Sequence, residues 1–96
     1  MNIKSIKFRE MAVPKGKQAL VYFGNEYKLS VVSHEGSYGG DRGLYEIAVL
    51  KNNDTVEMPG ITAEGDTVKG FLTESDVNVI IKKMHLATGA EPTQIC

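Results

Sequence analysis

The chain has 96 residues, of which 42% are hydrophobic and 24% charged, and its formal net charge is −1. This length suits one domain, and the near-neutral charge excludes a general attraction to nucleic acid or to an anionic membrane. The single cysteine, Cys96, excludes an internal disulfide and a cysteine metal cluster. No apolar stretch reaches the length of a membrane span, and the N-terminal "MNIKSIKFRE" has no signal-peptide pattern. We therefore expect a protein of a reducing cytoplasm.

The first half of the chain predicts three strands. Residues 2–8 mix apolar and basic side chains, which is typical of an edge strand that lysines protect from further pairing. Apolar side chains alternate along "KQALVYFG" (residues 17–24) and "YKLSVVS" (27–33), and the short turn "GNEY" joins the two. This pattern favours a β-hairpin.

A glycine-rich loop follows in "SHEGSYGGDRGLYEIAVL" (residues 33–50). Glycines between residues 36 and 43 can supply the positive φ angles that a long connection between strands needs. The next stretch, "LYEIAVL" (44–50), is apolar on both of its alternating faces, which indicates a central strand. Residues 51–54 have the composition of a turn.

The last part of the chain predicts an irregular loop, a short strand and a helix. Residues 58–66 contain one proline and two glycines, and "TVKGFL" (67–72) is the expected strand. Thr73 and Asp76 have the spacing of a helix capping box, and Gly89 is a natural helix end. The helix face expected to be buried carries Val77, Ile80, Ile81 and Met84.

These elements predict an α+β fold. We expect an antiparallel β meander of four to five strands with one C-terminal helix packed on one face. The predicted domain spans residues 1–89, and the segment 90–96 is expected to be a flexible tail.

The chain has no motif that predicts catalysis or cofactor binding. A G-x-G-x-x-G fingerprint and a P-loop are both absent, and a strand rather than a helix follows the glycines. His34 and His85 are far apart and have no metal-ligand spacing, and no serine lies in a G-x-S-x-G elbow. We therefore predict that the protein is not an enzyme and needs no cofactor or metal.

Candidate partner contacts lie in and after the glycine loop: Tyr38, Gly39, Gly40, Arg42 and Tyr45. Consecutive glycines can point N–H groups at an anion, arginine can bind it in bidentate fashion, and tyrosine can stack on a ring. Aromatic and arginine side chains also dominate binding energies. The alternative is a connection that only turns the chain, which we favour over an anion site.

Charge is unevenly distributed along the chain. Residues 1–34 carry six basic and two acidic side chains, whereas residues 35–96 carry five basic and ten acidic ones. Such polarity can favour head-to-tail self-association, although solvation of both regions is the simpler interpretation. The basic residues of the first part are spread over three segments, so they give no strong signal for nucleic acid.

Two segments, "SYGGDRGLYEIAVL" (37–50) and "GFLTESDVNVIIKKM" (70–84), carry a resemblance to a known group. They resemble small, mostly uncharacterised proteins encoded by tailed bacteriophages and prophages, and the likeness extends over roughly residues 20–84. Lys28 and most of the loop 58–66 depart from the group's pattern. The positions that fit are Asn25, Tyr27, Ser30 to Val32, Ser37 to Gly40, Gly43 to Glu46, Ala48 to Leu50, Gly70, Leu72 to Glu74, Val77 and Asn78.

The resemblance implies a phage protein in the cytoplasm of an infected bacterium, and it implies no reaction. We expect a small accessory protein that binds and sequesters or inhibits a host factor, for instance in counter-defence. The target would be a host protein or a small anionic ligand such as a signalling nucleotide, and no membrane is expected to take part. The alternative is a phage structural, assembly or replication-support protein that acts through homo-oligomerisation.

Overall fold

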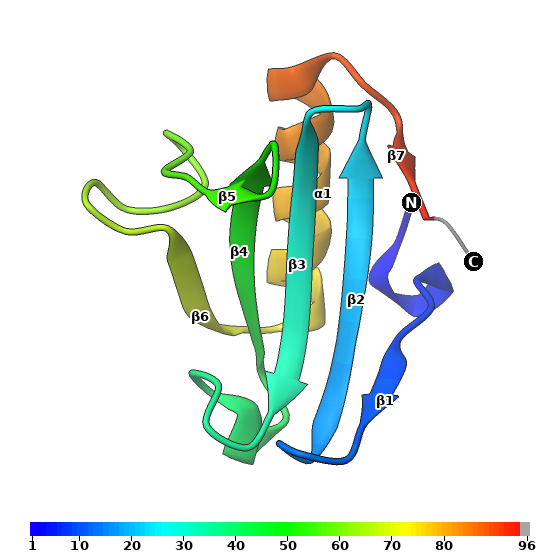
Figure 1. Ribbon diagram of the computed structural model, residues 1–96, viewed down its shortest axis with the longest axis vertical. Coiled ribbons are helices and arrows are strands. Elements are labelled where there is room, and N and C mark those ends of the chain that lie inside the picture. The colour runs from blue at the N-terminus through cyan, green and yellow to red at the C-terminus, as the bar shows by residue number, and fades with distance from the viewer. Residues whose placement is uncertain (95–96) are drawn as a thin grey trace.

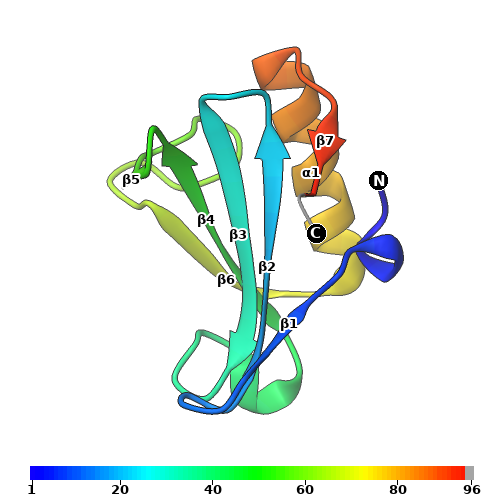
Figure 2. The ribbon, with the colours of Figure 1, turned by 45° about the vertical axis from the view of Figure 1, so that its right-hand side comes forward.

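The computed structural model describes residues 1–94 as one antiparallel sheet with a helix on one face (Figures 1 and 2). The strands follow the order β1-β2-β3-β4-β5, β6 also pairs with β4, and β7 also pairs with β2. The predicted α+β fold is confirmed. Its elements are η1 (Ile3–Ser5), β1 (Arg9–Met11), β2 (Gly16–Phe23), β3 (Tyr27–His34), η2 (Gly40–Arg42), β4 (Tyr45–Lys51), β5 (Asp54–Thr55), β6 (Val68–Leu72), α1 (Glu74–Thr88) and β7 (Pro92–Thr93).

The three long strands β2, β3 and β4 form the centre of the sheet, as their alternation predicts. In each strand every second side chain faces α1, so Val21, Leu29 and Val49 lie in one row and are fully buried. Asn52 and Asn53 both have positive φ angles, of 51° and 71°. Two such residues make a tight hairpin turn, and this turn adds the short strand β5 to β4.

Helix α1 begins and ends as the sequence predicts. The Thr73 hydroxyl accepts a hydrogen bond from the N–H of Asp76 at 3.2 Å, and the Asp76 carboxylate accepts one from the N–H of Thr73 at 2.9 Å. Gly89 ends the helix in the left-handed conformation, with φ of 72°. The predicted stripe of Val77, Ile80, Ile81 and Met84 is buried against the sheet.

The N-terminal segment is a correction, because residues 2–8 form no strand. Asn2 and Ser5 instead cap the short helix η1 through reciprocal hydrogen bonds. This turn places Ile3 and Ile6 on one side, where both are buried. The N–H of Ile3 donates to Oδ1 of Asn78 in α1 at 2.7 Å, which holds the segment against the helix. The first strand begins only at Arg9.

The C-terminal segment also differs from the flexible tail predicted for residues 90–96. Strand β7 pairs with the end of β2. The Gln94 side chain accepts from the N–H of Lys7 and donates to the carbonyl groups of Lys7 and Leu20. Residues 92–94 therefore belong to the folded domain, whereas Cys96 lies outside the described residues. Strands β1 and β7 line the outer edge of β2 (Figure 1), and Gln94 contacts the same edge through the Leu20 carbonyl.

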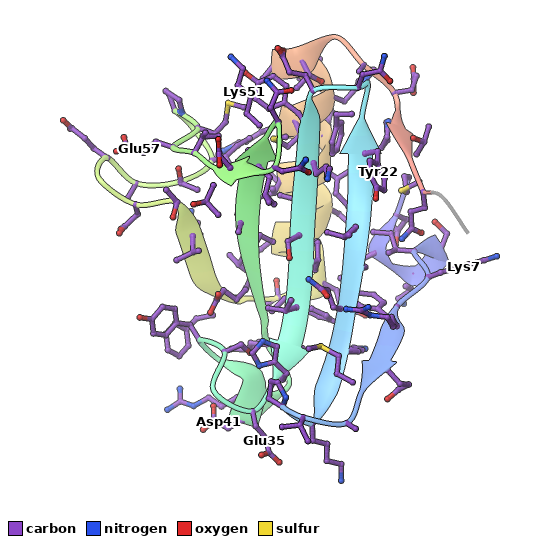
Figure 3. The ribbon with its side chains drawn as sticks, viewed as in Figure 1. Lys7, Tyr22, Glu35, Asp41, Lys51 and Glu57 are labelled. Carbon is purple, nitrogen blue, oxygen red and sulfur yellow. The ribbon has the colours of Figure 1, made fainter. Side chains whose placement is uncertain are left out.

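The open face of the sheet, opposite α1, faces the viewer in Figure 3, which labels Tyr22 on it. The rows of this face mix polar and apolar side chains, such as Leu20 beside Ser30 and Tyr22 beside Lys28. In residues 1–94, no helix is long and apolar enough to cross a lipid bilayer.

The capping box makes the stability of α1 depend on pH. Hydrogen bonds from the backbone and side chain of Thr73 hold the pKa of Asp76 below its ordinary value. A carboxyl with a lowered pKa stabilises the fold above its unfolded pKa, and this stabilisation is lost as the pH falls through the folded pKa. Asp76→Ala should therefore lower the Tm at neutral pH, and the difference from wild type should shrink at pH values below the ordinary aspartate pKa.

Circular dichroism melts over a pH series measure this difference. Ser75→Ala, a change at the neighbouring exposed position, is the control and should show no pH-dependent difference. A Tm difference for Asp76→Ala that stays constant across the series would contradict the role given to the carboxylate.

Candidate functional site

The glycine loop between β3 and β4 is folded back on itself. The Ser37 side chain accepts from the N–H of His34 at 3.0 Å and donates to the His34 carbonyl at 2.8 Å. An added Cβ at Gly40 would collide with that same carbonyl and with the Ser37 hydroxyl. Gly39 and Gly43 flank η2 with φ angles of 88° and 72°, which side chains rarely tolerate. The backbone geometry of the loop therefore requires glycine at these positions, which agrees with the interpretation that the loop only turns the chain.

The backbone N–H groups of this loop point inward. Within residues 37–44, six of the eight amides donate to acceptors inside the protein, and the acceptor for Tyr38 is the Glu46 carboxylate. An anion cradle needs several N–H groups that converge on a shared external point. The arrangement therefore argues against the anion site considered for Gly39 and Gly40. The six donors are Ser37, Tyr38, Gly40, Arg42, Gly43 and Leu44.

The backbone of Tyr38 docks the loop onto strand β6. Its carbonyl accepts from the N–H of Phe71 at 3.1 Å, and its own N–H donates to Oε1 of Glu46 at 2.8 Å. Gly70 permits this approach, because a Cβ at that position would overlap with the Cβ of Tyr38. The glycine loop and β6, far apart in sequence, therefore form one surface.

Strand β6 carries a bulge where the loop docks. Tyr45 pairs with Leu72 and Ile47 with Lys69, so β6 has one residue more than β4 between these pairs. Phe71 in this bulge has a φ of 57°, a left-handed conformation that is unusual for a bulky residue. Its side chain is turned to solvent and is 56% exposed.

Tyr38 and Phe71 form an exposed aromatic pair. Their ring centroids are 6.3 Å apart, the rings are inclined by 23°, and Tyr38 is 58% exposed. Beside the aromatic pair lies a hollow of about 550 Å³, here named the β6 hollow. Its lining consists of Val68–Phe71 from β6, Gly60–Ala63 and Asp66 from the preceding loop, and Tyr38. The aromatic pair and the β6 hollow together are the candidate site.

The other predicted contacts are not all brought to this site. Arg42 is exposed at the end of η2 and lies in the docked loop, but it does not line the β6 hollow. Tyr45 is only 6% exposed and packs against Phe8, with ring centroids 5.8 Å apart. Lys17 lies over both rings. This is a correction: Tyr45 closes one end of the core, and its ring is not available to a partner.

Histidine and carboxylate side chains are the residue types that a metal site would require. In residues 1–94, no three histidine, cysteine, aspartate or glutamate side chains come close enough to hold a metal ion. Nδ1 of His34 lies 2.8 Å from the Glu35 carbonyl oxygen, and Nδ1 of His85 lies 2.8 Å from that of Ala90. Each histidine is thus engaged locally, at one end of β3 and in the last turn of α1.

Phe71 and Gly70 are site residues that the sequence reasoning missed. The alternation of "TVKGFL" places Phe71 in the same series as Thr67 and Lys69, which are polar. An aromatic residue on the polar face of a strand is a candidate for an exposed contact. This alternation could therefore have identified Phe71. The close approach of Tyr38 to Gly70 has no such signal, because the two residues are distant in sequence.

Comparisons of the chain with protein-family models, with curated proteins and with solved structures gave no match.

The left-handed backbone of Phe71 can be tested by stability alone. A non-glycine residue in this conformation costs about 1–2 kcal/mol. Phe71→Gly and Phe71→Ala both remove the ring, but only the glycine relieves the strain. We expect Phe71→Gly to unfold with a free energy about 1 kcal/mol higher than Phe71→Ala, as measured by urea denaturation.

Lys69, an exposed residue of the same strand without a positive φ, gives the matched control. There the alanine variant should be more stable than the glycine variant, because glycine weakens an ordinary strand position. The same order at Phe71, with alanine above glycine, would contradict the strained conformation.

Proposed function

We propose that this protein is a small non-enzymatic phage accessory protein that binds and sequesters or inhibits a host factor, and that the aromatic pair is its main contact. The observation that carries the proposal is the combination of exposure and strain at Phe71. A ring held outward on a left-handed backbone contributes little to the core, yet it costs free energy. Such a residue is better explained by binding than by stability.

The chemistry of the site supports a protein target over an anionic one. Aromatic side chains that are already positioned lose little entropy when they bind, and they dominate the energies of protein interfaces. A phosphate would instead need free N–H groups or clustered cations. Most amides of the docked loop are used inside the protein, and the lining of the β6 hollow offers Lys69 together with the opposing charge of Asp66.

Affinity capture from bacterial lysate tests the proposed function. The double variant Tyr38→Ala with Arg42→Ala should lose the captured host protein, because it removes an aromatic and an arginine contact from the docked loop. Its Tm should stay close to that of wild type, since both side chains are exposed. Quantitative mass spectrometry of the captured proteins, together with a melting curve, measures both effects.

Leu86→Ala is the matched control, because Leu86 is an exposed apolar residue of α1 that does not line the β6 hollow. This variant should retain the captured protein. A double variant that captures the same protein as wild type would overturn the proposed contact, and one that unfolds would show that the loop is structural.

The uneven charge of the chain supports a second candidate, assembly through homo-oligomerisation. If the basic and acidic regions met across subunits, salt would weaken the contact. Light scattering at low and high salt should then show a larger mass at low salt. A monomer that salt does not affect would rule this alternative out.

A further inference from the structure

We propose that the outer edge of β6, at Val68–Gly70, binds an extended segment of a partner protein as an additional strand. This inference rests on the proposed function, because it takes the partner to be a protein. It adds the form in which that partner is bound.

Strand β6 is the longest edge strand of the sheet, and Tyr38 covers it at the Phe71 end. On one side β2 is lined by β1, Gln94 and β7, and on the other β4 is lined by β5 and β6. Among the described strands β6 pairs with β4 alone, and it is longer than the edge strands β1, β5 and β7. In Figures 1 and 2, β6 lies at the left of the sheet with its outer side turned away from β4.

The register indicates which backbone groups face this edge. The N–H of Val56 donates to the carbonyl of Val49, so Val49 turns its backbone toward the side of β4 where β5 and β6 lie. Backbone direction alternates along a strand, so Ile47 turns toward the same side and faces its partner Lys69. Val68, next to Lys69, therefore directs its N–H and C=O outward, where an added strand could pair with them.

Tyr38 already makes the first bond of such a pairing. Its carbonyl accepts from the N–H of Phe71 at the bulge, which closes this edge at one end. The β6 hollow continues from there along Val68–Gly70. A partner strand would occupy the hollow. It would form backbone hydrogen bonds with β6 next to the one that Tyr38 already makes. Backbone pairing of this kind gives affinity with little dependence on sequence.

The lining of the β6 hollow specifies the side chains of the partner segment. Ala63 and Val68 supply apolar surface, while Asp66 and Lys69 oppose each other in charge. The aromatic pair lies at the end where Tyr38 docks. The fitting partner is therefore an extended, weakly charged segment with an apolar or aromatic side chain beside the rings.

A displayed library of short random peptides, selected on the immobilised full chain, provides the probe. Synthetic copies of the enriched peptides are then titrated into isotope-labelled protein. We expect the amide signals of Val68, Lys69 and Gly70 to shift most, and hydrogen exchange at Val68 to slow. A copy of the same peptide that is N-methylated at alternate residues should bind at least about tenfold more weakly, because it loses backbone hydrogen bonds.

Val68→Pro tests the same edge from the protein side. Proline removes the outward N–H and leaves the pairing of Lys69 with Ile47 in place, so peptide affinity should fall about tenfold. Val79→Pro would break the helix, so Val79→Ala, at an exposed position of α1, is the control and should bind as wild type does. Where Val68→Pro unfolds, the N-methylated peptide still decides the question.

Three outcomes would overturn the inference: no enriched peptide binds in solution, the shifts map to the open face of the sheet, or N-methylation leaves affinity unchanged. Slowed exchange at Val68 that depends on protein concentration without peptide would assign the edge to a second copy of the chain, and would also overturn it. The proposed function is tested separately. If the Tyr38 and Arg42 double variant loses its captured protein while no peptide contacts β6, the function stands and the edge inference fails.

Discussion

The two hydrogen bonds made by the backbone of Tyr38 are the constraint on which the surface of this protein depends. One fixes the glycine loop to Phe71 in β6, and the other fixes it to Glu46 in β4. Both the acceptor and the donor are backbone groups of the loop that joins β3 to β4. Gly70 allows the approach because it has no Cβ. The loop therefore becomes a fixed part of the sheet edge.

This docking links the bulge of β6 to its exposed chemistry. The extra residue in the bulge gives Phe71 a left-handed backbone, and the bond to Tyr38 holds that conformation. The two rings consequently lie beside each other at one end of the β6 hollow. Bulges commonly redirect a side chain near a functional site, and here the redirected side chain is aromatic. The same bond ends the free edge of β6, so the ring pair and the edge belong to one surface.

Local patterns predicted the main elements well. The alternation of β2, β3 and β4, the capping box at Thr73 and the buried stripe of α1 all depend on near neighbours in sequence. The N-terminal turn and the docked residues 92–94 were missed because the bond from Ile3 to Asn78 and the bonds of Gln94 join distant segments. Only part of the candidate site could be predicted, because sequence patterns report local structure and not contacts between distant segments. Tyr38 has a recognisable loop context, whereas its contact with Gly70 and the burial of Tyr45 follow from tertiary packing.

The most direct test of the account is the hydrogen bond between Phe71 and Tyr38. A scalar coupling across this bond, between the amide nitrogen of Phe71 and the carbonyl carbon of Tyr38, can be measured by NMR in labelled protein. We predict a detectable coupling, with slow hydrogen exchange at Phe71 and fast exchange at Val68. If no coupling is found and Phe71 exchanges as fast as Val68, the loop is not docked on β6. That result would contradict both the aromatic pair and the closure of the β6 edge at Phe71.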